Sequence, residues 1–175
     1  MITLIYGGSG SGKSEFAEGF VCEKHYDIQY YLATMAAFDD EAKARIQKHR
    51  EARAGKGFET IEQPFDAAKI TNNINENGII LLECLSNLVA NEMFRDGQII
   101  PSEKCIEKIF EDLKVLAGHI SELVIVSNDI FDDGVQYDET TMDYLKALGA
   151  LNSMLASEAE EVYEVVVGIP LKIKG

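Results

Sequence analysis

Cysteine is scarce in this 175-residue chain, which contains three. Cys22, Cys84 and Cys105 are widely spaced and odd in number, so the sequence predicts neither a disulfide framework nor a zinc site. This cysteine usage is typical of a reducing compartment, and we expect a cytoplasmic protein. We also expect all three residues to be buried as small apolar side chains.

Long hydrophobic runs are also missing. The most apolar stretch, GIILLECLSNLVA, is interrupted by Glu83, Ser86 and Asn87, and no stretch reaches the ~18 apolar residues that a membrane span needs. The apolar N-terminus is too short for a signal peptide. Apolar residues still make up 46% of the chain. This composition and the length predict one domain over residues 1–175.

Positive charge is in deficit, because 16 Lys and Arg face 30 Asp and Glu and give a net charge of −14. Such a chain repels nucleic-acid backbones, so we expect no nucleic-acid partner. Residues 43–56, KARIQKHREARAGK, are the exception, with six basic residues and one acid. This island predicts either a site for an anionic ligand or a solvated helix face.

Short apolar segments alternate with amphipathic ones along the chain, a pattern that predicts an α/β fold with a mostly parallel sheet flanked by helices. Two C-terminal segments, 162–168 and 171–174, meet at Gly168 and Pro170. Glycine and proline at this junction predict a turn and an antiparallel hairpin. The remaining predicted strands are 2–6, 28–34, 58–61, 78–83 and 123–128. The predicted helices are 13–25, 39–53, a short one from Asp66, 85–95, 102–118 and 139–159.

The sequence GGSGSGKS follows the first predicted strand and opens the first predicted helix, which is the context that a phosphate-binding loop requires. Glycines allow backbone N–H groups to surround phosphate oxygens, and the helix N-terminus adds partial positive charge. Lys13 is expected to contact the outer phosphates and Ser14 to bind Mg²⁺. The predicted nucleotide site therefore includes Gly7, Gly8, Ser9, Gly10, Ser11, Gly12, Lys13 and Ser14.

A phosphate-transfer site also needs an acid near the loop, to orient the metal ion or to accept a proton. Glu83 ends the apolar strand IILLE. Because ligands of open α/β sheets bind beyond the carboxyl ends of the strands, we expect Glu83 at the site and as a metal ligand. The alternative is a strand-end carboxylate at the surface.

The basic island contains a histidine between arginines. On a helix, Arg45, His49 and Arg53 share one face, since they are four residues apart. The arginines disfavour a protonated imidazole and can hold phosphates bidentately, so His49 is a candidate nucleophile. An exposed helix histidine without a role is the alternative, and we expect no role for His25 and His119.

Several motifs together resemble the bifunctional adenosylcobinamide kinase / adenosylcobinamide-phosphate guanylyltransferase family. They include GGSGSGKS, YLAT followed by DDE, ARIQKHR with Arg53, TIE, ILLECLSNLVAN, VIVSND, GALN and GIPLKIK. The resemblance implies a RecA-like P-loop fold, a trimer, and two reactions at one nucleotide site. In these reactions ATP or GTP phosphorylates adenosylcobinamide, and GTP then delivers GMP through a histidine to give adenosylcobinamide-GDP in cobalamin biosynthesis.

Matching the motifs residue by residue makes His49 the guanylylated histidine, with Lys13 and Glu83 as further catalytic residues. The resemblance also implies nucleotide contacts at Ala33, Thr34, Met35, Arg50, Glu51, Ala52, Arg53, Glu62 and Glu83.

The chain departs from the family pattern in segment 129–147, which has no proline or arginine and carries six acids. Two alternatives therefore stay open. One is a P-loop small-molecule kinase without guanylyl transfer, and the other is a non-enzymatic nucleotide-sensing module.

Overall fold

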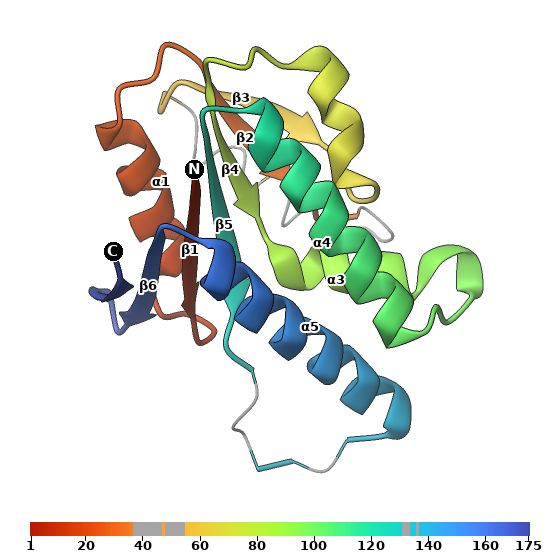
Figure 1. The fold of residues 1–175 in the computed structure, drawn as a ribbon. Coiled ribbons are helices and arrows are strands. Elements are labelled where there is room, and N and C mark those ends of the chain that lie inside the picture. The colour runs from red at the N-terminus through yellow and green to blue at the C-terminus, as the bar shows by residue number, and fades with distance from the viewer. Residues whose placement is uncertain (37–46, 48–54, 131–133, 136) are drawn as a thin grey trace.

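The computed structural model describes residues 1–36, 47, 55–130, 134–135 and 137–175, and a seven-stranded sheet forms its centre (Figure 1). The strands are β1 (Ile2–Gly7), β2 (Gln29–Ala33), β3 (Phe58–Glu62), β4 (Ile79–Glu83), β5 (Glu122–Asn128), β6 (Glu161–Val166) and β7 (Ile169–Lys174). Their order across the sheet is β3-β2-β4-β5-β1-β6-β7. All neighbours pair in parallel except β6 and β7, so the predicted mostly parallel sheet is confirmed.

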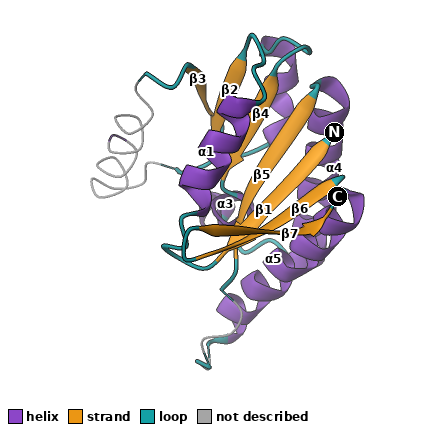
Figure 2. Ribbon diagram, turned by 90° about the vertical axis from the view of Figure 1, so that its left-hand side faces the viewer, coloured by secondary structure: helices purple, strands orange, loops and turns teal. Residues whose placement is uncertain are grey.

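Helices cover both faces of the sheet (Figure 2). Helix α1 packs on one face through Ala17 and Val21, and α3, α4 and α5 pack on the other. The helices are α1 (Lys13–Glu23), α3 (Leu85–Met93), α4 (Ser102–His119) and α5 (Glu139–Glu158), with short 3-10 helices η1 (Ala67–Asn73) and η2 (Arg95–Gly97). The carboxyl ends of the six parallel strands therefore meet at one edge, where ligands of such sheets bind.

The two central strands β4 and β5 are continuous apolar runs because helices cover them on both sides. Residues 79–82 of β4 and 123–126 of β5 have no exposed surface. Each strand ends in a polar residue, Glu83 and Asn128, at the ligand-binding edge. The core thus fixes the two strand ends from which the site is built.

Some predicted boundaries were wrong. The first helix ends at Glu23 rather than at residue 25, because His25 adopts a left-handed backbone conformation (φ 54°) that ends a helix. The helix predicted from Asp66 is the 3-10 helix η1. The helix predicted over 85–95 ends at Met93, and η2 follows it.

The C-terminal hairpin is confirmed, but its turn lies at Val167 and Gly168 alone. Val166 pairs with Ile169, and both turn residues have positive φ (46° and 81°), as a two-residue turn between twisted strands requires. Pro170 was predicted to lie in the turn and instead lies within β7, opposite Val165. A strand at the edge of a sheet tolerates the missing N–H group of proline.

The cysteine prediction holds for two of the three residues. Cys84 and Cys105 are buried, whereas Cys22 on α1 is half-buried, and all three are free thiols. Cys22 lies on the side of α1 that faces Lys56, whose carbonyl accepts from the Cys22 thiol at 3.9 Å, and not against the sheet.

Of the helix predicted over 39–53, the structure describes Gln47 alone, which is helical, and the other residues lie outside the described part of the chain. Among the helices that the structure does describe, none has the length and apolar character needed to cross a bilayer.

Candidate functional site

The segment predicted to bind phosphate forms a loop between β1 and α1. The Ser11 N–H donates to the Gly8 carbonyl (3.2 Å). Gly12 at the helix N-terminus has φ 89°, a backbone conformation that would be strained in a residue with a side chain. Gly7 is required for a different reason: a Cβ atom there would lie 2.5 Å from the Val165 carbonyl oxygen. The sequence predicts glycines for backbone shape, and at these two positions the structure shows why.

Lys13 lies folded over this loop. Its side chain is buried, and Nζ donates to the Gly8 carbonyl at 3.0 Å. The first residue of a helix therefore holds its ammonium group above the backbone N–H groups of the loop, which is where a bound polyphosphate would place its outer oxygens.

Ser14 and Glu83 meet at the carboxyl edge of the sheet. The Ser14 hydroxyl donates to Glu83 Oε1 at 2.6 Å, although the two residues are 69 positions apart. A hydroxyl and a carboxylate are oxygen ligands of the kind that Mg²⁺ binds beside a nucleotide, so this pair fits that ion. Sequence reasoning paired these residues, and the fold brings them together.

Three predicted site residues lie side by side at the ends of three neighbouring strands. Ala33 of β2 is in register with Glu83 of β4 on one side and with Glu62 of β3 on the other. Thr34 follows directly, with its N–H donating to the Glu83 carbonyl and its hydroxyl to the Cys84 carbonyl (3.1 and 2.8 Å). Met35 is half-buried beyond them.

The predicted nucleophile is not among these groups. His49 and its neighbours Arg45, Arg50, Glu51, Ala52 and Arg53 lie outside the described residues. Whether the fold brings them to the loop therefore stays a prediction. His25 and His119 are described: His25 lies two residues beyond α1, and His119 is the last residue of α4.

Sequence reasoning missed a layer of hydrogen bonds beneath the site. The Asn128 side chain donates to the Ser86 hydroxyl at 2.6 Å, and Ser86 also contacts the Cys84 sulfur at 2.9 Å. The Ser127 hydroxyl donates to Asn152 Oδ1 on α5 (2.6 Å). The polar residues that interrupt the apolar strand and helix patterns were the signal, since a buried polar group needs a partner.

The C-terminal hairpin also supports the loop. The Gly168 N–H donates to the Ser11 carbonyl at 2.7 Å, and a Cβ atom at Gly12 would lie 3.2 Å from the Gly168 Cα atom. The turn between β6 and β7 thus packs directly on the phosphate loop. No feature of the sequence had linked these two segments.

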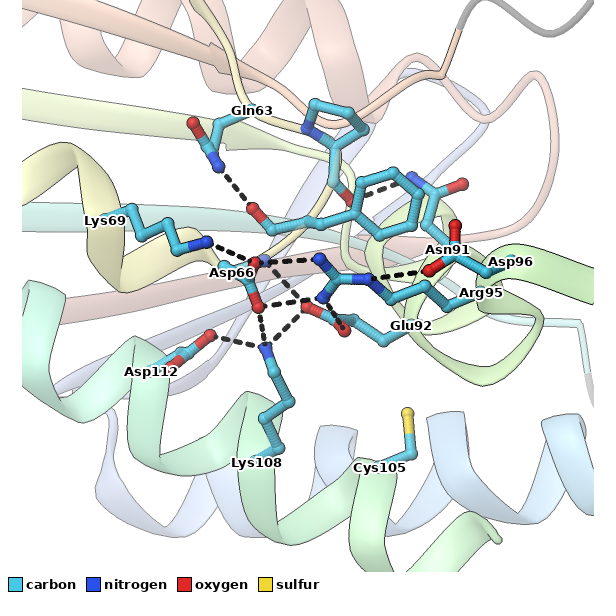
Figure 3. A network of polar contacts seen from close by, with 12 residues as sticks. Gln63, Asp66, Lys69, Asn91, Glu92, Arg95, Asp96, Cys105, Lys108 and Asp112 are labelled. Carbon is cyan, nitrogen blue, oxygen red and sulfur yellow. Dashed lines mark hydrogen bonds and ion pairs between the residues drawn. The ribbon is translucent and has the colours of Figure 1, made fainter. Parts of the chain in front are cut away.

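A cluster of charged residues lies between η1, α3 and α4 (Figure 3). The carboxylates of Asp66, Glu92 and Asp112 converge there, and the Lys108 ammonium lies within 3.0 Å of each of them. Arg95 adds a bidentate contact to Asp66 (3.0 and 3.1 Å). Because a lysine already occupies the centre of these carboxylates, the cluster is an ion-pair network and needs no metal ion.

The contacts in this network shift the pKa values of Asp66 and Lys108. The hydrogen bond from Arg95 is the main cause that holds the pKa of Asp66 well below its usual range. Burial by itself would lower the pKa of Lys108, but hydrogen bonds to Glu92, Asp66 and Asp112 outweigh it and raise that pKa. Both groups are therefore charged at neutral pH.

The fold is similar to those of several solved structures. A solved ATPase domain matches with a TM-score of 0.53 at 13% identity, over 93% of this chain and 68% of that one. The flagellar accessory protein FlaH from Methanocaldococcus jannaschii matches with a TM-score of 0.51 at 12% identity, over 99% and 77%. At such low identity these similarities show the fold alone, and they confirm the predicted P-loop architecture.

Sequence similarity is much closer to two bifunctional adenosylcobalamin biosynthesis proteins. CobU of Escherichia coli K12 is 32% identical over 99% of this chain and 100% of its own length. CobP of Pseudomonas aeruginosa is 33% identical over 100% of this chain and 98% of its own. The profile of the family described as cobinamide kinase / cobinamide phosphate guanyltransferase matches residues 3–173. The chain belongs to this family.

Proposed function

We propose that the protein phosphorylates adenosylcobinamide with a nucleoside triphosphate and then transfers GMP from GTP to the product, giving adenosylcobinamide-GDP for cobalamin biosynthesis. Family membership over residues 3–173 gives the substrates. The observation that carries the chemistry is the contact between Ser14 and Glu83 beside Lys13 in the phosphate loop. A family of enzymes offers no support for a purely nucleotide-sensing module.

In the kinase step the hydroxyl oxygen of the aminopropanol group attacks the γ-phosphorus. A new P–O bond forms, the bond to the β–γ bridging oxygen breaks, and the nucleoside diphosphate leaves. Lys13 neutralises charge that develops on the transferred group, and Glu83 orients the metal or accepts the hydroxyl proton. Ser14 and Glu83 would hold Mg²⁺, which would help to neutralise the negative charge of the triphosphate.

In the second step an imidazole nitrogen of His49 attacks the α-phosphorus of GTP. An N–P bond forms, the bond to the α–β bridging oxygen breaks, and pyrophosphate leaves. A phosphate oxygen of cobinamide phosphate then attacks the same phosphorus and releases the imidazole. The Arg45–His49–Arg53 spacing supports this role, because flanking guanidinium groups favour a neutral imidazole and hold phosphates.

The remaining nucleotide contacts are proposed from the family resemblance. Ala33 to Met35 and Glu62 lie at the ends of adjacent strands, on the same edge of the sheet as Glu83. That shared edge supports one nucleotide spread across β4, β2 and β3. Arg50, Glu51, Ala52 and Arg53 complete the proposed set. A single domain, a homotrimer and a cytoplasmic location also belong to this proposal.

Labelling with GTP tests the proposal. With radiolabelled GTP and Mg²⁺ we expect the protein to retain acid-labile GMP, and His49→Ala to abolish the label. His119→Ala is the matched control, because His119 ends α4 next to the opposite edge of the sheet, and it should label like the wild type. Undiminished labelling of His49→Ala would reject His49 as the nucleophile.

The kinase-only alternative keeps one observation in its favour, the six acids of segment 129–147. Mass spectrometry after incubation with cobinamide, ATP and GTP separates the two. Accumulation of cobinamide phosphate without the GMP adduct would favour the kinase alone, and conversion to the GDP form would exclude it.

A further inference from the structure

The ends of β2 and β3 are joined by a side chain from α3. Asn91 is buried on this helix, and its Nδ2 donates both to the Thr34 carbonyl (2.7 Å) and to the Pro64 carbonyl (2.9 Å). An amide nitrogen carries two donors, so these two bonds use its full capacity. Figure 3 shows Asn91 directed at the segment that follows β3.

The two carbonyls belong to the segments on which nucleotide contacts are proposed. Thr34 is itself one of the proposed contacts, and Pro64 is two residues beyond another, Glu62. Regular pairing between β2 and β3 ends nearby. The last backbone hydrogen bond between them runs from the Gln63 N–H to the Ala33 carbonyl (3.0 Å). Beyond that point Asn91 replaces the ladder as the connection between the two chain segments.

Residues of α3 and of η2, which follows it, hold the same segment. Glu92 accepts from the Asp66 N–H at 2.7 Å, and Arg95 binds the Asp66 carboxylate while its guanidinium lies 4.9 Å from the centre of the Phe65 ring. Residues 64–66 are therefore fixed to α3 and η2 at three consecutive positions. Of these contacts, the one through Asn91 also reaches β2.

We infer that Asn91 is a positioning residue for the nucleotide. By fixing the spacing between Thr34 and Pro64, it sets the distance between the β2 and β3 contacts with the base or ribose, without touching the nucleotide itself. This inference rests on the proposed function, because it needs a nucleotide at these strand ends. On this inference Asn91 affects the affinity for the nucleotide, whereas the phosphate loop acts in the chemical step.

The test compares Asn91→Ala with Tyr30→Phe by isothermal titration with a non-hydrolysable GTP analogue and Mg²⁺. Tyr30 is the matched control because it is buried at the opposite end of β2, where its hydroxyl accepts from the Asn75 N–H (2.9 Å). Asn91→Ser, which keeps one donor, provides a milder variant should the alanine protein fail to fold.

We expect Kd to rise on the order of tenfold for Asn91→Ala, less for Asn91→Ser, and not for Tyr30→Phe, although Tm falls in all three. At saturating nucleotide, kcat of the kinase step should change less than about threefold, while KM follows Kd. A Kd within about twofold of the wild type in both Asn91 variants, or an equal rise in Tyr30→Phe, would overturn the inference. Failure of the wild type to bind would overturn the proposed function itself.

Discussion

The two halves of the proposed nucleotide site are held by different means. The loop half, residues 7–14 with Glu83, is fixed by main-chain turns, the start of α1 and the strands β1 and β4, which flank β5. The braced half, residues 33–35 and 62–66, lies at the carboxyl ends of β2 and β3 and is fixed by side chains of α3. Backbone shape thus fixes the half proposed to bind the phosphates, whereas side chains fix the other half.

Replacing a glutamate with glutamine should change kcat in the loop half and KM in the braced half. Glu83→Gln removes the charge beside Ser14, so we expect kcat of the kinase step to fall by about 10²–10³ with little change in KM. Glu62 lies two strands from Glu83, and both are in register with Ala33. We expect Glu62→Gln to raise KM for the nucleotide by about three- to tenfold, with kcat nearly unchanged.

Steady-state kinetics of both variants measures this difference. Identical effects on kcat in the two proteins would show that the halves are not functionally distinct.

Backbone contacts in the loop half should be sensitive to a single added methyl group. In Gly7→Ala the new Cβ would lie 2.5 Å from the Val165 carbonyl oxygen, so β6 or the loop must shift, and we expect a loss of about 1–3 kcal/mol in the free energy of unfolding. Gly8→Ala is the control, because its Cβ would meet no atom within 4 Å and should cost less than about 0.5 kcal/mol. Urea unfolding measures both, and equal losses would contradict the close approach.

The braced half should show its own dependence on pH. The pKa of Asp66 is lower in the folded protein than in the unfolded chain, mainly because Arg95 binds the carboxylate. The ionised carboxylate therefore stabilises the fold above about pH 4, and this contribution is lost as the pH falls towards the folded pKa. Asp66→Asn should lower stability at pH 7 and flatten its decrease with acid.

Asparagine also adopts the left-handed backbone that Asp66 has (φ 51°), so the substitution tests the charge and not the turn. Asp96→Asn is the matched control, since Asp96 has φ 55° and a side chain that is 91% exposed. Urea unfolding at several pH values distinguishes the variants. A wild-type pH profile in Asp66→Asn would contradict the ion-pair account.

The smallest expected effect concerns the thiols. Burial raises the pKa of Cys105 to about 12 and also raises the pKa of Cys84, which directly follows Glu83 in the loop half. Half-buried Cys22 should therefore react first with a thiol reagent at pH 8, and the other two should react only after unfolding. Rapid reaction of Cys84 in the native protein would show that the loop half opens.

Apolar patterning and the phosphate-loop motif were enough to predict the sheet, the main helices and the meeting of Ser14 with Glu83. These features follow from local sequence, since buried parallel strands and glycine loops have strong signatures. The Asn91 contacts and the packing of Gly168 on the loop could not be predicted, because they join segments that are close only after the chain folds. Likewise, the extent of α1 was misjudged because nothing in its sequence signals the left-handed conformation of His25.

The central claim is that one nucleotide site, built around the loop half, binds the triphosphate of each of the two reactions in turn. GMP labelling of the Lys13→Ala protein tests it most directly, because Lys13 belongs to the loop and His49 is the proposed acceptor. We predict that Lys13→Ala loses the kinase activity and the labelling of His49 together. Labelling at the wild-type rate in a protein without kinase activity would contradict the claim and require a second nucleotide site.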